Sequence, residues 1–142
     1  MYGSNNLPEH QKHIFDAILG FGSNGRPTSF LLTRIGNEVN NRAFLSRKSV
    51  CGGYPRATSS SGDKQACDEY PYNSTLQGGT NNYDLGNVSV RLVPSDESQL
   101  QGQFIKKTYK NAPININDHF LVIPLGGVSG FLDKSWRWHV FH

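Results

Sequence analysis

The sequence predicts a loop-rich α+β fold in which a small antiparallel sheet is packed with helices. Hydrophobic residues make up 36% of the 142 residues, and 15 glycines and 7 prolines fit a mixed structure better than a helical bundle. Helical and alternating apolar patterns also follow one another along the chain. A chain of this length is predicted to be a single domain, residues 1–142, whose core needs no metal.

Three helices are predicted from apolar residues at helical spacing. They are expected from Pro8 to Gly20 or Gly22, over residues 36–47 and over residues 96–110. The last of these carries carboxylates in its first turn and lysines near its end, which is the arrangement that the helix dipole favours.

Strands and turns are predicted between these helices. We expect strands over residues 29–34, 88–93 and 120–123, and one final strand in the tail from residue 131. The glycine-rich stretches 77–86 and 126–130 are expected to form turns.

Charge and hydropathy narrow the range of partners. The net charge of +3 and a pI of about 9.0 permit polyphosphate partners without requiring them. No run approaches the apolar length that spans a membrane, so no membrane association is expected. The N-terminus is too polar for a signal peptide, so a secreted protein would be present here in its mature form or as an excised domain with an added start.

The two cysteines point to an oxidising environment. Cys51 and Cys67 bracket a loop rich in glycine and serine, and a disulfide between them would remove about 3 kcal/mol of loop-closure entropy from the unfolded chain. Two unpaired thiols are the alternative. Glycosylation sequons at Asn73 and Asn87 agree with an extracellular setting.

The segment Cys67–Tyr72 holds the highest density of chemically active side chains. Adjacent carboxylates on an extended segment point to opposite faces, so Asp68 and Glu69 are not expected to share one ligand. We expect one of them to face a catalytic cleft and the other a structural partner. An acidic surface turn is the alternative.

Two histidines lie three positions apart on the first predicted helix. His10 and His13 form a conceivable metal pair, but no third ligand is evident nearby. Surface or half-buried histidines are therefore the favoured interpretation.

The order of the predicted elements brings carboxylate and amide oxygens together. Two strands followed by a helix can place Asp68 near Glu97, Ser98 and Gln101, because Glu97 and Gln101 share one helix face. Such oxygen ligands suit a hard divalent cation that keeps several waters. A cation beside a base is what phosphodiester hydrolysis needs.

Several motifs in this order are shared with a known family. They are Leu31–Arg34, Asn41–Arg42, Cys67–Tyr72, Ser74–Thr75, Gln77–Gly79, Val93–Pro94 with Glu97, and Gln101–Gly102. With these motifs the chain resembles the NucA/NucB deoxyribonuclease family over about residues 7–122. The resemblance implies a metal-dependent DNA endonuclease without sequence preference, built on a ββα-metal (His-Me finger-like) core.

The resemblance also implies roles for the site residues. Asp68 is expected to be the general base, where the wider superfamily usually has a histidine, and to lie at the metal. Glu97 is expected to bind the metal and Gln101 to complete its shell, with Mg²⁺ or Mn²⁺ as cofactor and Zn²⁺ or Ca²⁺ as alternatives. Glu69 is expected to secure the loop. Ser98 departs from relatives, which often carry asparagine there, so an amide that could assist the metal site is absent.

Basic residues are expected to contact the phosphates of the substrate. Arg42 or Arg91 is predicted at the scissile phosphate, although a helix-surface arginine is the alternative for Arg42. The flanking phosphates are assigned to three lysines of the last helix, Lys106, Lys107 and Lys110. His119, the only histidine near these motifs, is a spare candidate base.

These expectations describe a secreted, extracellular and monomeric enzyme that acts on double-stranded DNA, with single-stranded DNA as a further substrate. One alternative is a toxin domain of a larger secreted protein that an inhibitor or immunity protein neutralises. The other is a non-catalytic module that binds nucleic acid or glycan through the basic helix and a platform of aromatic side chains, Tyr70, Tyr72, Trp136 and Trp138.

Overall fold

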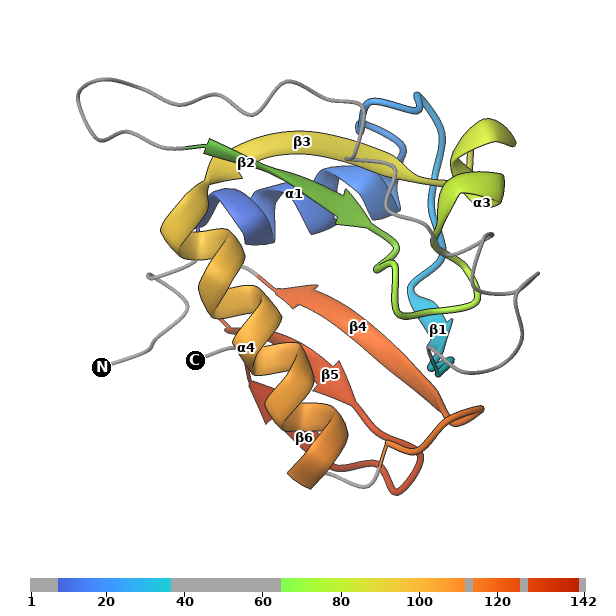
Figure 1. The fold of residues 1–142 in the computed structure, drawn as a ribbon, viewed down its shortest axis with the longest axis vertical. Helices are drawn as coiled ribbons and strands as arrows, with labels where there is room; N and C mark the ends of the chain where they lie inside the picture. The colour runs from blue at the N-terminus through green and yellow to red at the C-terminus, as the bar shows by residue number, and fades with distance from the viewer. Residues whose placement is uncertain (1–7, 37–64, 112–113, 126–127, 141–142) are drawn as a thin grey trace.

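The fold is taken from a computed structural model that describes residues 8–36, 65–111, 114–125 and 128–140 (Figure 1). Arg42, Cys51 and nearly all of the helix predicted over residues 36–47 lie outside these ranges. The disulfide between Cys51 and Cys67 therefore stays a prediction. No helix within the described ranges is both long and apolar enough to cross a membrane.

Helices and strands are mixed along the described chain. Their order is α1 (Pro8–Leu19), β1 (Leu31–Thr33), β2 (Gln65–Tyr70), α3 (Thr80–Asp84), β3 (Ser89–Pro94), α4 (Ser95–Asn111), β4 (His119–Leu125), β5 (Val128–Leu132) and β6 (Trp138–Val140).

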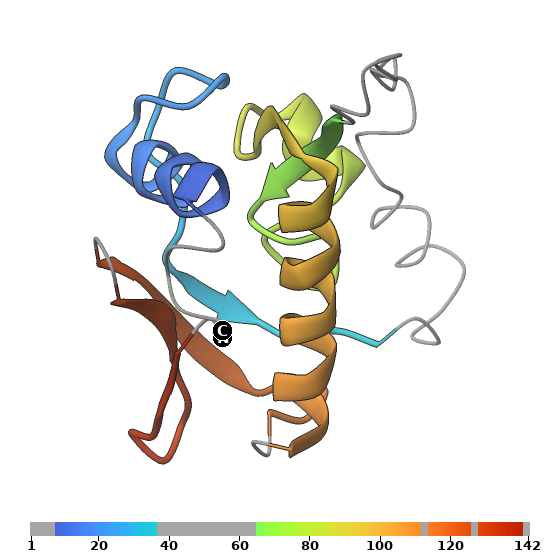
Figure 2. The same cartoon turned by 90° about the vertical axis from the view of Figure 1, so that its left-hand side faces the viewer.

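The strands form two antiparallel sheets. One has four strands in the order β1-β4-β5-β6, and the other pairs β2 with β3. Helix α4 starts where β3 ends and runs along the four-stranded sheet, while α1 lies against the β2–β3 pair (Figures 1 and 2). The predicted α+β class with a small antiparallel sheet is confirmed.

An aromatic core connects the two sheets. Tyr70 and Tyr72 lie at the end of β2 and are buried, and the ring of Tyr72 is 5.9 Å from that of Phe131 in β5. Phe131 in turn contacts Phe104 of α4 and Phe120 of β4, with ring centroids 5.5 and 5.0 Å apart. The segment that was expected to carry the site is therefore anchored in the core. Tyr70 and Tyr72 therefore cannot belong to the exposed aromatic platform of the alternative binding module, whereas its other two members, Trp136 and Trp138, are exposed.

The predicted helices and strands with clear periodicity are confirmed within the described ranges. The glycine-rich stretches are where predictions were wrong: residues 80–84 form helix α3, and residues 128–130 belong to strand β5. The tail makes two strands instead of one. Asp133 causes this reversal, because its Oδ1 accepts the N–H groups of Ser135 and Arg137 and so closes a turn between β5 and β6.

Candidate active site

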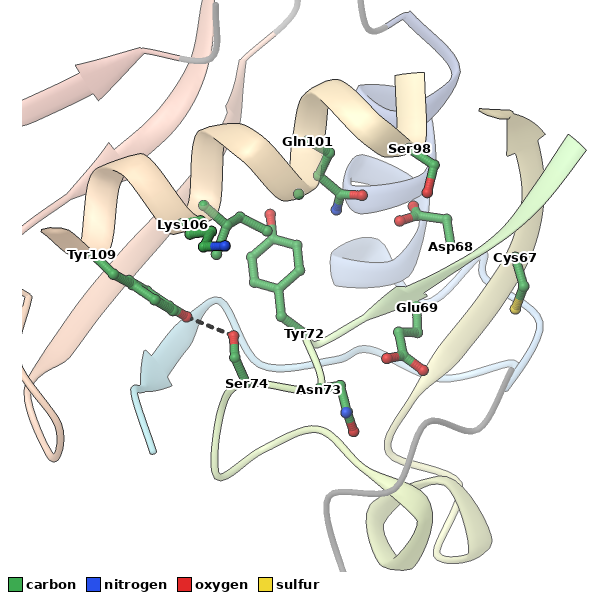
Figure 3. A pocket seen from close by; sticks show the side chains of 12 residues that line it. Cys67, Asp68, Glu69, Tyr72, Asn73, Ser74, Ser98, Gln101, Lys106 and Tyr109 are labelled. Carbon is green, nitrogen blue, oxygen red and sulfur yellow. Dashed lines mark hydrogen bonds between the residues drawn. The ribbon is translucent and has the colours of Figure 1, made fainter. Parts of the chain in front are cut away.

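The acidic segment lies at the end of strand β2. Pairing with β3 places Asp68 opposite Arg91. Figure 3 shows the Asp68 side chain pointing towards α1 and α4, whereas the Glu69 side chain points to the other side of the strand. The two side chains thus leave the strand in different directions, although both line the groove described below.

The turn after β2 explains the glycines that follow it. The N–H of Thr75 donates to the carbonyl oxygen of Tyr72 at 3.0 Å, and a Cβ on Gly78 would lie 2.1 Å from the same oxygen. The side chain of Gln77 accepts the N–H of Thr33 at 2.8 Å, which holds the turn against β1. Only glycine fits at position 78, so the turn keeps its place beside the site.

Two histidines of α1 converge on one oxygen of Asp68. Nδ1 of His13 lies 2.6 Å and Nδ1 of His10 lies 3.1 Å from Oδ2 of Asp68. Burial alone would raise the pKa of Asp68, but its charge interactions and hydrogen bonds with His10 and His13 outweigh burial and hold that pKa well below its usual range. Asp68 is therefore a carboxylate that can only accept, so both Nδ1 atoms carry the hydrogen.

The other ring nitrogen of His13 fixes its orientation. Nε2 lies 2.9 Å from Oγ of Ser89 on β3, and Ser89 Oγ also accepts the N–H of Ser23 at 3.1 Å. His13 and Ser89 are both fully buried, so this chain of hydrogen bonds connects α1 to β2 and β3 away from solvent.

The interpretation of His10 and His13 as surface or half-buried residues was wrong. Both are fully buried. The third group, which was not evident beside them in the sequence, is the carboxylate of Asp68. A signal was present in the sequence, because positions 10, 13, 14 and 17 lie on one helix face and Ile14 and Ala17 are core residues. Two histidines on a core face indicate a buried acidic partner.

Glu97 binds the N-terminus of α1 across the structure. Its Oε1 accepts the N–H groups of Glu9 and His10 at 3.0 and 3.1 Å, which satisfies two donors that the helix itself leaves unpaired. Burial raises the pKa of Glu97, and the two N–H hydrogen bonds act against that shift. The helix that carries the histidines is thus positioned by the carboxylate predicted at the metal.

A groove of about 410 Å³ separates β2 and its turn from helix α4 (Figure 3). On the strand side it is lined by Cys67, Asp68, Glu69, Tyr72, Asn73 and Ser74. On the helix side it is lined by Ser98, Gln101, Gly102, Ile105, Lys106 and Tyr109. The groove therefore brings Asp68 together with Ser98 and Gln101, whereas Glu97, which was expected beside them, is not among the lining residues. The groove also contains the predicted phosphate contact Lys106.

Two groups from opposite walls close the end of the groove remote from Asp68. The hydroxyl groups of Ser74 and Tyr109 are 2.8 Å apart, and the guanidinium of Arg34 lies 4.5 Å from the centre of the Tyr109 ring. None of these was predicted as a site residue. Their long-range contacts carry no local sequence signal.

A protein-family model matches most of the chain. The model that describes deoxyribonuclease NucA/NucB matches residues 21–123. The chain belongs to the NucA/NucB deoxyribonuclease family. No curated protein and no solved structure matches the chain.

Family membership implies a nuclease of the hydrolase class with DNA as its substrate. The matched range contains β2, β3 and α4 with every residue of the groove. Helix α1 precedes it, so His10 and His13 lie outside the matched range.

Divalent metals serve this nuclease family in general, so we asked whether the side chains fit a cation. The described residues contain no group of three His, Cys, Asp or Glu side chains that could hold one. Two side-chain oxygens could take the predicted roles of metal ligands. One is Oε2 of Glu97, which takes no part in the two hydrogen bonds that cap α1, and the other is the amide oxygen of Gln101, one turn later on α4. A site with only a few oxygen ligands suits Mg²⁺ or Mn²⁺ better than Zn²⁺, because Mg²⁺ and Mn²⁺ keep several of their waters.

The predicted phosphate contacts are dispersed. Lys106 lines the groove, whereas Lys107 and Lys110 are exposed on α4 outside the groove lining. Arg91 forms an ion pair with Asp16 of α1 at 3.0 Å and does not line the groove. Arg42 lies outside the described residues.

His119 lies apart from this groove. It is in β4 opposite Thr33, and its Nδ1 lies 2.9 Å from Thr33 Oγ1. His119 is not among the lining residues, whereas Glu69 and Cys67 are. The spare candidate base is thus on the other sheet, and His10 and His13 are the histidines beside Asp68.

Proposed function

We propose that this protein is a secreted, metal-dependent endonuclease that hydrolyses DNA phosphodiester bonds without sequence preference. The observation that carries the proposal is the groove in which Asp68 faces helix α4, with Lys106 on the same wall as Gln101. In this proposal β2, β3 and α4 form the ββα-metal core, and the match to the deoxyribonuclease family supplies the substrate class.

Asp68 is proposed to act on the attacking water. Its two histidine partners contact Oδ2 and hold the carboxylate in one orientation. Oδ1 is the oxygen outside these two contacts. A carboxylate with so low a pKa is always in the form that accepts a proton, but it is a weak base. The water that it deprotonates must therefore be more acidic than bulk water.

Glu97 and Gln101 are proposed to hold the cation, directly or through water. They share one face of α4, and both are buried, with 5% and 6% of their surface exposed. When bound there, a divalent cation lowers the pKa of water and neutralises charge that develops on the phosphate. The remaining groups of the groove bind and orient the strand.

The groove offers contacts to the sugar-phosphate backbone. Lys106 supplies positive charge, and Asn73, Ser74 and Ser98 supply small polar groups. Contacts of this kind set the position of DNA but carry no sequence information.

The test is the cleavage of supercoiled plasmid DNA by the purified protein. We expect nicking and then fragmentation with Mg²⁺ or Mn²⁺, full inhibition by EDTA, and recovery when excess metal is restored. DNA binding without cleavage under every metal tested would overturn the proposal and favour a binding module.

A further inference from the structure

One face of helix α4 forms a wall of the groove. Ser98, Gly102, Lys106 and Tyr109 follow one another at spacings of four, four and three residues, which places them in one row along the helix. Gly102 lies in the interior of this 17-residue helix, where glycine costs about 1 kcal/mol relative to alanine. A destabilising residue at this place needs a reason.

The fold itself does not require glycine at position 102. A Cβ placed there would meet no atom of the described residues within 4 Å, and Gly102 has no positive φ. The contrast with two other glycines is clear, because a Cβ would lie 2.1 Å from the Tyr72 carbonyl oxygen at Gly78 and 2.3 Å from Ser89 Oγ at Gly22. Gly102 is therefore open towards the groove, and no described residue requires glycine there, which points to a molecule that enters the groove.

We propose that the sugar-phosphate backbone of the DNA strand runs along α4 in van der Waals contact with Gly102. This inference rests on the proposed function and deepens it by giving the strand a path. One turn before Gly102, Ser98 lies at the Asp68 end, where the scissile phosphate binds. One turn after it, the ammonium of Lys106 binds a flanking phosphate.

The dimensions agree with this path. From Ser98 to Lys106 the helix rises about 12 Å. Phosphates along one strand of duplex DNA are about 3.4 Å apart along the helix axis. Lys106 is therefore within reach of a phosphate a few nucleotides from the scissile one, and the strand passes Gly102 between these two phosphates.

The test replaces Gly102 with alanine and uses Gln103→Ala as the matched control. Gln103 is the next residue of α4, is exposed and does not line the groove. We expect Gly102→Ala to fold with a Tm at or above that of the wild type, because alanine is the better helix former. Its kcat/KM for plasmid DNA should fall by about tenfold or more, because the added methyl displaces the strand from Asp68. Gln103→Ala should stay within about twofold of the wild type.

Binding separates this inference from catalysis. The Kd of a fluorescein-labelled duplex in EDTA, measured by fluorescence anisotropy, should rise for Gly102→Ala and not for Gln103→Ala. Equal cleavage and binding by Gly102→Ala and wild type would overturn the inference while the proposed function stands. A lowered Tm for Gly102→Ala would also overturn it, because the fold would then require glycine. Absence of cleavage by the wild type would instead remove the proposed function.

Discussion

Nδ1 of His13 lies 2.6 Å from Oδ2 of Asp68, with His13 fully buried and Asp68 buried except where it lines the groove. The histidine comes from α1 and the aspartate from β2, 55 residues later in the sequence. Because Ser89 holds the other ring nitrogen at 2.9 Å, His13 has one fixed orientation. Asp68 is consequently positioned by a helix that lies outside the matched family range.

Replacement of His13 tests whether this contact positions Asp68. We expect His13→Ala to lower kcat by about 10- to 100-fold, as is typical when the partner of a site residue is removed, with a smaller change in KM. His13→Asn keeps an N–H donor near the position of Nδ1 and should restore part of the lost kcat. Steady-state kinetics on plasmid DNA, with Tm measured for each variant, check this. If His13→Ala retains wild-type kcat, the positioning role is wrong.

Glu97 has two proposed roles that two variants separate. Glu97→Gln keeps an oxygen for the N–H groups of Glu9 and His10 but removes the negative charge. We expect nearly unchanged thermal stability and either lost activity or a much higher metal requirement. Glu97→Ala removes the cap as well and should reduce the free energy of unfolding by about 1 kcal/mol. An unchanged metal titration for Glu97→Gln would remove Glu97 from the metal site.

Two lysines of α4 can be replaced to give variants of equal net charge. Lys106 lines the groove, while Lys107 is exposed outside its lining. We expect Lys106→Ala to weaken DNA binding and to flatten the slope of log Kd against log salt concentration by about 0.9, the value for one lost phosphate contact. Lys107→Ala should leave that slope unchanged. Equal effects of both substitutions would show that only overall charge matters.

The sequence predicts those parts of the fold in which the hydrophobic period is clear. Helices α1 and α4 and strands β3 and β4 are of this kind. Helix α3 was missed because residues 80–84 are polar and follow glycines, so no apolar stripe marks them. The turn between β5 and β6 was missed because the side chain of Asp133 forms it, and periodicity does not detect such contacts.

The candidate site was predicted where motifs are local. Asp68, Gln101 and Lys106 meet in one groove, as expected from the order of strand and helix. The histidines were misjudged because polar residues are usually exposed, and only the buried charge of Asp68 reverses that preference. The cap that Glu97 places on α1 joins residues 88 positions apart, a distance that no local pattern bridges.

The most direct test of the account is the cleavage of plasmid DNA by Asp68→Asn. Asparagine has nearly the same shape, and its oxygen can accept the N–H groups of His10 and His13, so we expect a folded protein that binds DNA with wild-type affinity. Its rate of nicking in Mg²⁺ or Mn²⁺ should fall by about 100-fold or more, as is usual when a general base is lost. Nicking at the wild-type rate would contradict the account.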